Sequence, residues 1–106
     1  EVAVSKALAK TTLKNTGLPP YIYQGGEVRI PGSDYIWARN LLANRLFECP
    51  VVYAEPYVMN SHEVFARVQA GDYDGKKKVA GTMRKSIYKE YADAVVEGLV
   101  NHYSQR

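Results

Sequence analysis

The residue of this sequence with the clearest chemical potential is a glutamate that follows a short apolar run. Residues 51–54 form the run, Glu55 ends it, and Pro56 turns the chain at once. A continuous apolar run with β-branched residues predicts a central strand of a parallel sheet, and open α/β sheets bind ligands at the carboxyl ends of their strands. A carboxylate held there, partly removed from water, can accept and return a proton near neutral pH. A general base is therefore one interpretation of Glu55.

An ion pair is the competing interpretation of this glutamate. Its carboxylate could pair with Arg39, Arg45 or Arg67, or it could cap a neighbouring helix. Carboxylates at the edge of a core are often simply paired. Residue spacing alone therefore favours a structural role for Glu55.

The two histidines and the single cysteine form no recognisable reactive motif. His62 and His102 fall within predicted helices, where we expect surface or helix-end positions and not metal ligands. Cys49 excludes an internal disulfide and fits no metal motif, so we expect it to be buried beside the strand as a small apolar residue. No metal ligand is predicted within this chain.

Aromatic side chains are a weaker sign of binding. Nine tyrosines are many for 106 residues, and some could stack on sugar rings. We expect Tyr53, Tyr88 and Tyr91 in the core. Tyr57 lies next to Glu55 and is expected near a substrate.

A basic segment in the second half of the chain has two possible roles. It contains Lys76, Lys77 and Lys78, followed by Arg84 and Lys85. It could meet an anionic wall polymer or nucleic acid, but a solvated surface loop is the more usual outcome for such a run.

Four helices are predicted around the apolar run. Apolar spacing of three and four residues places them at residues 4–17, 33–48, 60–71 and 86–103. Gly17 suits a helix C-terminus, and Ser33 and Ser86 suit N-caps. Residues 18–32, with their prolines and glycines, predict a loop or short extended edge structure, and residues 72–85 predict a surface loop.

Composition predicts a single globular domain over residues 1–106. The chain is 46% hydrophobic and 24% charged, and its net charge of +3 is only mildly basic. No apolar run approaches the roughly 20 residues that span a bilayer. The chain begins without methionine and already reads as a helix, so we expect it to be a piece of a longer protein whose targeting signal lies elsewhere.

The order of elements indicates an α/β protein with an incomplete sheet. A fully apolar strand needs neighbours on both edges and helices on both faces. Residues 51–54 are the one segment that the pattern clearly predicts to be a strand. The remaining strands are therefore either the weak ones near residues 21–30 or absent from this chain.

One part of the sequence resembles a known enzyme family. The segment CPVVYAEPYVMNSHEVFARV, which begins at Cys49, is similar to the last core strand and next helix start of the zinc-dependent N-acetylmuramoyl-L-alanine amidases, a type of peptidoglycan hydrolase. The residues that follow the family outline are Pro50, Val51, Val52, Glu55, Asn60 and Glu63. The segment IYKEYADAVVEGLVNHY resembles the closing helix of the family through Ala92, Val95, Gly98, Leu99 and Tyr103. The resemblance covers about residues 35–103, and the first helix agrees more weakly.

Three departures separate this chain from the family pattern. Pro56 and Tyr57 replace a Gly-Phe pair after the glutamate, Asn60 falls one residue early, and the link before the strand is longer than usual. A divergent branch with an altered substrate would show such differences.

The resemblance implies a fold, a reaction and a location. The fold would be a three-layer α/β/α arrangement with a mostly parallel sheet, present here only as its C-terminal portion. Zinc, held by two histidines and a glutamate upstream of this chain, would activate a water that attacks the amide between N-acetylmuramic acid and L-alanine. Glu55 would be the general base, with Tyr57 and Asn60 at the substrate. The partner would be peptidoglycan and not nucleic acid, the location would be the cell envelope, periplasmic or secreted, and the isolated piece would be inactive.

Two other classes of function remain open. The chain could be a small binding module that uses its tyrosines and lysines on carbohydrate or nucleic acid. It could also be an interaction domain that keeps an enzyme-like fold without the chemistry.

Overall fold

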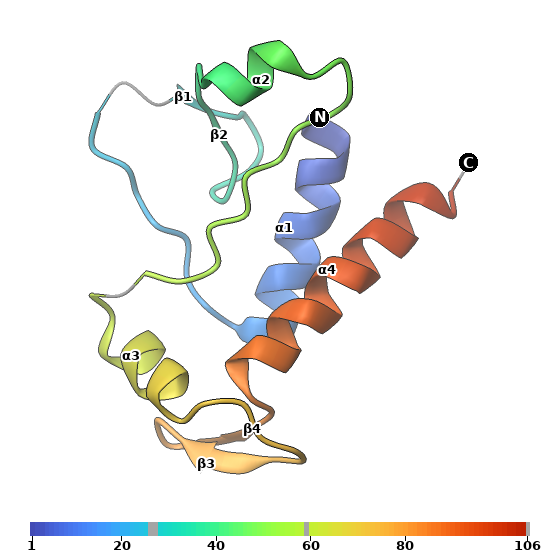
Figure 1. Cartoon of the computed structure of the whole chain (residues 1–106). Helices are drawn as coiled ribbons and strands as arrows, with labels where there is room; N and C mark the ends of the chain where they lie inside the picture. The colour runs from blue at the N-terminus through green and yellow to red at the C-terminus, as the bar shows by residue number, and fades with distance from the viewer. Residues whose placement is uncertain (26–27, 59, 106) are drawn as a thin grey trace.

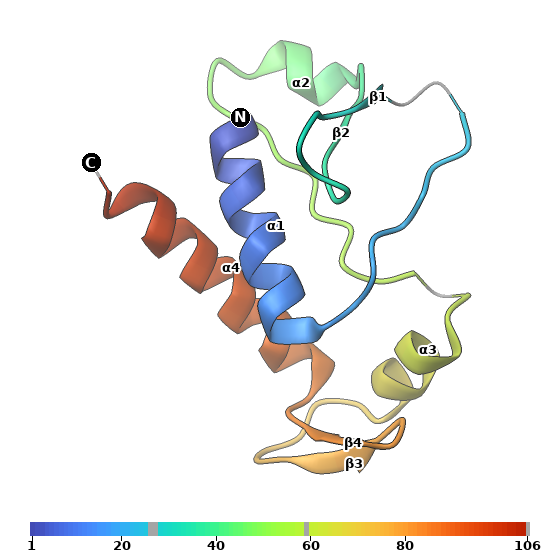
Figure 2. The ribbon, with the colours of Figure 1, turned by 180° about the vertical axis from the view of Figure 1, so that it is seen from behind.

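Two long helices and several short elements make up the structure, a computed structural model that describes residues 1–25, 28–58 and 60–105 (Figure 1). In chain order the elements are α1 (Val2–Thr16), β1 (Val28–Arg29), β2 (Trp37–Ala38), α2 (Leu42–Leu46), α3 (His62–Gln69), β3 (Lys77–Val79), β4 (Thr82–Arg84) and α4 (Ile87–Tyr103). Figures 1 and 2 show α1 and α4 side by side, with α2, β1 and β2 towards one end of the pair and α3, β3 and β4 at the other.

The expected three-layer α/β/α fold with a mostly parallel sheet is wrong for this chain. The strands of the described residues form two separate antiparallel pairs, β1 with β2 and β3 with β4. Residues 51–54, expected to be the central strand, have no strand partner within the described ranges, and Val52 and Tyr53 are exposed. An extended segment becomes a strand only when neighbouring strands share its backbone hydrogen bonds. Here the segment runs along α1 instead.

Residues 33–48 contain one short helix, α2, instead of the long helix expected from Ser33. The Ser33 hydroxyl accepts a hydrogen bond from the Tyr35 backbone N–H at 3.2 Å, and the Ile30 N–H donates to the Ile36 carbonyl at 2.9 Å. These bonds close a turn between β1 and β2. Local bonds of this kind compete with helix formation, which explains why the helix starts only at residue 42.

The ends of the other helices agree with the sequence signals. α1 ends at Gly17, whose φ of 65° is left-handed and whose N–H donates to the Leu13 carbonyl at 2.8 Å. Ser86 caps α4, because its hydroxyl accepts from the Lys89 N–H at 3.2 Å. Ser61 caps α3 in the same manner. The ends at Gly17 and Ser86 were expected from the sequence.

Two further expectations need correction. Residues 72–85, expected as a loop, contain the β3–β4 hairpin. Cys49 is exposed and not buried, because the strand beside which it was expected to pack does not form. Of the expected loop at residues 18–32, residues 26 and 27 lie outside the described residues.

The contact between α1 and α4 depends on small side chains. A Cβ atom at Gly98 would lie 2.7 Å from Thr11 Oγ1 and 3.1 Å from Leu8 Cα, so α4 approaches α1 more closely than any larger residue would permit. The Thr11 hydroxyl donates to the Ala94 carbonyl at 2.7 Å across the same contact. This approach fixes the position of α4 against α1.

A buried arginine joins the ends of three helices. The Arg67 side chain in α3 is 1% exposed and forms an ion pair with Glu90 in the first turn of α4. It also donates to the Thr16 carbonyl at 2.9 Å, at the C-terminus of α1, where carbonyl groups carry partial negative charge. Arg84 on β4 donates to the same oxygen at 3.1 Å. Since buried charges are costly unless paired, these contacts hold α3 and β4 against the helix pair.

Apolar packing is concentrated at the same place. Leu18, Val64 and Ile87 form a buried cluster, and Tyr57 and Val68 pack against it. Leu18 follows α1, Val64 belongs to α3, and Ile87 begins α4. The cluster therefore draws together the three helices that the ion pair joins.

Replacing Arg67 by leucine should lower the free energy of unfolding by about 3 kcal/mol, because the buried Glu90 would lose its nearest partner and keep only Arg84, whose Nη1 lies 3.9 Å away. Urea unfolding followed by circular dichroism measures the loss. The control is Arg29→Leu, which removes an exposed pair with Asp34 and should cost less than about 1 kcal/mol. Equal effects of the two substitutions would contradict the role given to Arg67.

Gly98→Ala should destabilise the protein by about 1 kcal/mol or more, although alanine is the better helix former. The added methyl group would force α1 away from α4. The cost, measured by urea unfolding, should be smaller in a Thr11→Ala background, where the closest atom is absent. Unchanged stability of Gly98→Ala would rule out the close approach of the helices.

Candidate functional site

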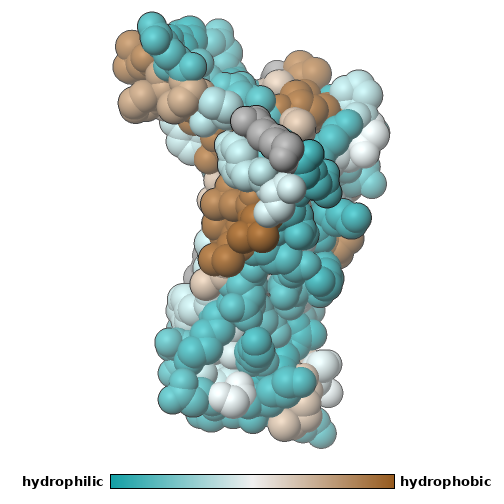
Figure 3. Space-filling model, turned by 90° about the vertical axis from the view of Figure 1, so that its right-hand side faces the viewer, coloured by the Kyte–Doolittle hydropathy of each residue, from teal (hydrophilic) through white to brown (hydrophobic). Residues whose placement is uncertain are grey.

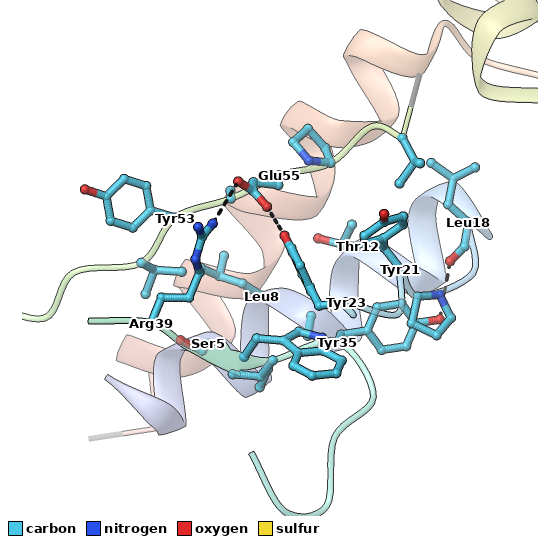
Figure 4. Close-up of a pocket in the computed structure, with 18 of the residues that line it drawn as sticks. Ser5, Leu8, Thr12, Leu18, Tyr21, Tyr23, Tyr35, Arg39, Tyr53 and Glu55 are labelled. Atoms are coloured by element: carbon cyan, nitrogen blue, oxygen red, sulfur yellow. Dashed lines mark hydrogen bonds and ion pairs between the residues drawn. The ribbon is translucent and has the colours of Figure 1, made fainter. Parts of the chain in front are cut away.

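A cavity of about 250 Å³ lies against α1, where segments distant in the sequence meet (Figure 4). Its lining comes from α1, from residues 18–23, 35–44 and 51–58, and from Tyr91 and Val95 of α4. Most of these side chains are apolar or aromatic. The extended segment that was expected to be a strand therefore forms part of a cavity wall.

Glu55 lies at this cavity between a tyrosine and an arginine. The Tyr23 hydroxyl donates a hydrogen bond to Glu55 Oε2, and Arg39 Nη1 lies 3.8 Å from Glu55 Oε1. Figure 4 shows these three side chains converging from separate segments. The Glu55 side chain is 59% exposed, so water reaches the carboxylate. The site contains an oriented, solvent-accessible carboxylate next to a cation.

The ion pair expected for Glu55 is confirmed, and its partner is Arg39. Arg45 instead donates to Asn40 at 3.0 Å, and Arg67 belongs to the buried ion pair with α4. The expected position of Glu55 at the edge of a parallel sheet is wrong, since the described residues form no such sheet. An exposed ion pair is weak and opens readily, so the pairing leaves the carboxylate able to act on a ligand.

Six aromatic residues share the cavity with the carboxylate. Tyr53 and Tyr91 are two of them, and Tyr21, Tyr23, Tyr35 and Trp37 come from the chain before α2. The Tyr23 ring makes edge-to-face contacts with Tyr21 at 5.1 Å and with Trp37 at 5.3 Å between centroids. Sequence reasoning did not assign these residues to a site. The signal that could have indicated them is the crowding of aromatic residues between positions 21 and 37.

Two polar atoms of the cavity residues lack a hydrogen-bond partner in the described part of the chain. They are Trp37 Nε1, which is a donor, and Asn44 Oδ1, which is an acceptor, and both atoms are buried. Unsatisfied buried polar atoms are uncommon in folded proteins.

Tyr57 and Asn60, expected at the substrate, are not among the residues that line the cavity. Tyr57 packs edge-to-face against Tyr91 and against Tyr88, which is itself partly exposed, and its hydroxyl donates to the Ile87 carbonyl at 3.4 Å. Burial raises the pKa of the Tyr57 phenol, and the neighbouring phenols raise it further. Asn60 is exposed in the turn before α3.

The described residues do not fit a zinc site. His62 is exposed at the first position of α3, and His102 packs edge-to-face against Tyr103 near the end of α4. Nowhere in residues 1–25, 28–58 and 60–105 do three histidine, cysteine, aspartate or glutamate side chains come together. No catalytic step on this chain is therefore assigned to a metal.

No protein-family model matches this chain, and no curated protein or solved structure matches it either. Within the described ranges, none of the helices has the length and apolar character needed to cross a membrane, which agrees with the sequence analysis.

The Tyr57 phenol should ionise at a higher pH than an ordinary tyrosine. Because its folded pKa lies above the unfolded value of about 10, its contribution to stability is complete below that value and is lost as the pH rises through the folded pKa. Ultraviolet titration of the wild type and Tyr57→Phe isolates this phenol as a difference curve. The matched variant is Tyr53→Phe, which removes an exposed phenol. Coincident difference curves would contradict the burial of Tyr57.

Proposed function

We propose that this chain is part of a cell-wall hydrolase that cleaves the amide between N-acetylmuramic acid and L-alanine of peptidoglycan, with Glu55 as general base. The observation that carries the proposal is the solvent-accessible Glu55 carboxylate at an aromatic cavity, in contact with Tyr23 and Arg39. The resemblance of residues 35–103 to the amidases supports the same reaction. The proposal includes zinc ligands outside these 106 residues and a periplasmic or secreted location.

Glu55 would transfer a proton at two points of the reaction. Its carboxylate accepts a proton from the attacking water as the new bond to the amide carbon forms, and it returns that proton to the nitrogen as the C–N bond breaks. Oε2 of Glu55 already accepts a hydrogen bond from the Tyr23 hydroxyl. Oε1, which Arg39 approaches only to 3.8 Å, is the oxygen left for the water.

Arg39 gains a second role once Glu55 is protonated. In the resting protein its guanidinium faces the carboxylate. When the carboxylate becomes neutral, the positive charge of Arg39 is no longer compensated and can stabilise the negative charge that develops on the amide oxygen. An arginine paired with the base at rest can therefore assist the same reaction.

The cavity suits one sugar or amide group of the substrate. Tyr21, Tyr23 and Trp37 provide aromatic surface for a sugar ring. A volume of about 250 Å³ holds one such group, and the rest of the polymer would lie outside.

A non-catalytic binding module is the second candidate. The contacts of Glu55 with Tyr23 and Arg39 favour it, since a carboxylate that remains paired shapes the cavity without transferring a proton. Such a module would bind the same sugar or amide groups and leave the amide intact.

Glu55→Gln in the full-length protein that contains this chain should reduce amide cleavage by about 100-fold or more, because glutamine keeps the shape of the side chain but accepts no proton. Chromatographic release of the stem peptide from a muramoyl peptide measures the rate. The control is Glu48→Gln, which changes an exposed glutamate outside the cavity and should retain full activity.

Ligand binding by the same variants separates the two candidates. The fluorescence of Trp37, the single tryptophan of this chain, should respond to the muramoyl peptide in both the wild type and Glu55→Gln. Binding without cleavage by the wild type would favour the binding module. Unchanged cleavage by Glu55→Gln would show that Glu55 serves only as an ion-pair partner.

A further inference from the structure

The β3–β4 hairpin lies at the end of the molecule opposite α2, separate from the cavity (Figures 1 and 2). Its two central turn residues, Ala80 and Gly81, have φ values of 49° and 82°. Two-residue turns between antiparallel strands commonly have positive φ at both central residues, because this geometry matches the twist of the strands. We call residues 76–85 the lysine hairpin.

Three consecutive lysines in this hairpin keep uncompensated charge. Lys76, Lys77 and Lys78 are exposed and form no ion pair within the described part of the chain. Lysine side chains that stay unpaired on a small, fixed element raise the local positive potential. The hairpin is therefore a candidate surface for an anion.

The acidic residues nearby are already engaged with other lysines. Asp72 and Asp74 each lie 3.1 Å from Lys89 Nζ. Asp93 lies 3.0 Å from Lys85 Nζ. None of these three carboxylates forms an ion pair with Lys76, Lys77 or Lys78, although Asp93 compensates the charge of Lys85.

The hairpin is held firmly against the start of α4. The Tyr73 hydroxyl donates to the Arg84 carbonyl at 3.0 Å, and Lys89 Nζ donates to the Tyr73 carbonyl at 2.6 Å. The Ser86 hydroxyl donates to Asp72 at 2.6 Å, and this bond, with Lys89, lowers the pKa of the Asp72 carboxyl. The lysines are thus presented on an ordered support, which reduces the entropy lost on binding.

The strand register separates the lysines by face. The register of β3 pairs Lys77 with Arg84 and Lys78 with Met83, so these two lysines project from opposite faces of the hairpin. Lys77 Nζ lies 4.7 Å from the centroid of the Tyr73 ring. Lys76 directly precedes β3, so three exposed lysines follow one another along the chain and form a short row of charges that an extended polyanion can follow.

We propose that the lysine hairpin binds a linear phosphate polymer that carries no nucleobases. Such a ligand needs only a row of cations, and lysine binds phosphate as a point charge. The inference rests on the charge and geometry of residues 76–85 and is independent of the proposed reaction at Glu55.

The observations favour this partner over a membrane or a nucleic acid. The end of the molecule that carries the hairpin is largely hydrophilic in Figure 3, and Met83 alone offers little apolar area for insertion into lipid. Single-stranded nucleic acids are bound largely by stacking of bases on aromatic rings. Tyr73, the aromatic residue next to β3, is covered by Lys77.

A protein partner is also less suited to this surface. Protein interfaces depend on buried aromatic or arginine anchors. The arginine of the hairpin, Arg84, is directed to the Thr16 carbonyl and is only 20% exposed. Lysines without an anchor instead give the salt-dependent binding that is typical of polyanions.

Binding of the chain to fluorescently labelled inorganic polyphosphate, measured by anisotropy at several salt concentrations, tests the proposal. The logarithm of affinity should fall linearly with the logarithm of salt concentration. The double variant Lys76→Gln, Lys78→Gln should reduce this slope by about 1.5, because each lost phosphate contact contributes about 0.7–0.9. Its affinity at low salt should fall about tenfold or more.

A matched double variant removes the same charge elsewhere. Lys6→Gln with Lys10→Gln changes two exposed lysines of α1 and should leave both slope and affinity close to those of the wild type. Circular dichroism checks that both double variants remain folded. If the two double variants lost equal affinity for polyphosphate, binding would depend only on net charge, and the proposal would be overturned.

Competing ligands decide among the partner classes. Tighter binding of single-stranded DNA than of polyphosphate with the same number of phosphates would assign the surface to nucleic acid. Binding to phosphatidylglycerol vesicles without binding to polyphosphate would assign it to membranes. Either result, or no binding to polyphosphate at low salt, would overturn the proposal.

Discussion

The buried ion pair between Arg67 and Glu90 is the interaction on which most of the arrangement depends. A guanidinium almost fully removed from water must be compensated, and here the compensation comes from α4 and from the last carbonyl groups of α1. The chain can satisfy this charge only when the C-terminus of α1, the start of α4 and α3 meet at one point. Leu18, Val64 and Ile87 then form the apolar cluster beside it. The direction in which the chain leaves α1 is set at this junction.

The two candidate surfaces follow from that junction in different ways. Residues 18–23 leave it along α1 and meet residues 51–58, and the space between them becomes the cavity that contains Glu55. The lysine hairpin is attached on the other side through Arg84, which shares the Thr16 carbonyl with the buried arginine. A carboxylate in an aromatic cavity and a row of lysines are thus separated on one small protein. The two proposals therefore concern separate surfaces of the protein.

Helix ends were predictable because their causes are local. Gly17 ends α1 with a left-handed φ, and Ser86 starts α4 through its own hydroxyl, as their residue types indicate. The helix expected at residues 33–48 failed, since a local turn between β1 and β2 uses the backbone groups near Ser33. The strand expected at residues 51–54 failed for a non-local reason, because an apolar run is a strand only when other strands pair with it.

The sequence by itself determined the elements whose signals lie within a few residues, including both long helices, their caps and the run of lysines. It also indicated that Glu55 could pair with an arginine. Only the tertiary structure decided that the partner is Arg39, that Tyr23 donates to the same carboxylate, and that Trp37 lies at the same cavity. Long stretches of chain separate Glu55 from Tyr23, Trp37 and Arg39, so no local spacing relates the glutamate to them. Their meeting depends on how the extended segments pack along α1, which is a property of the whole fold.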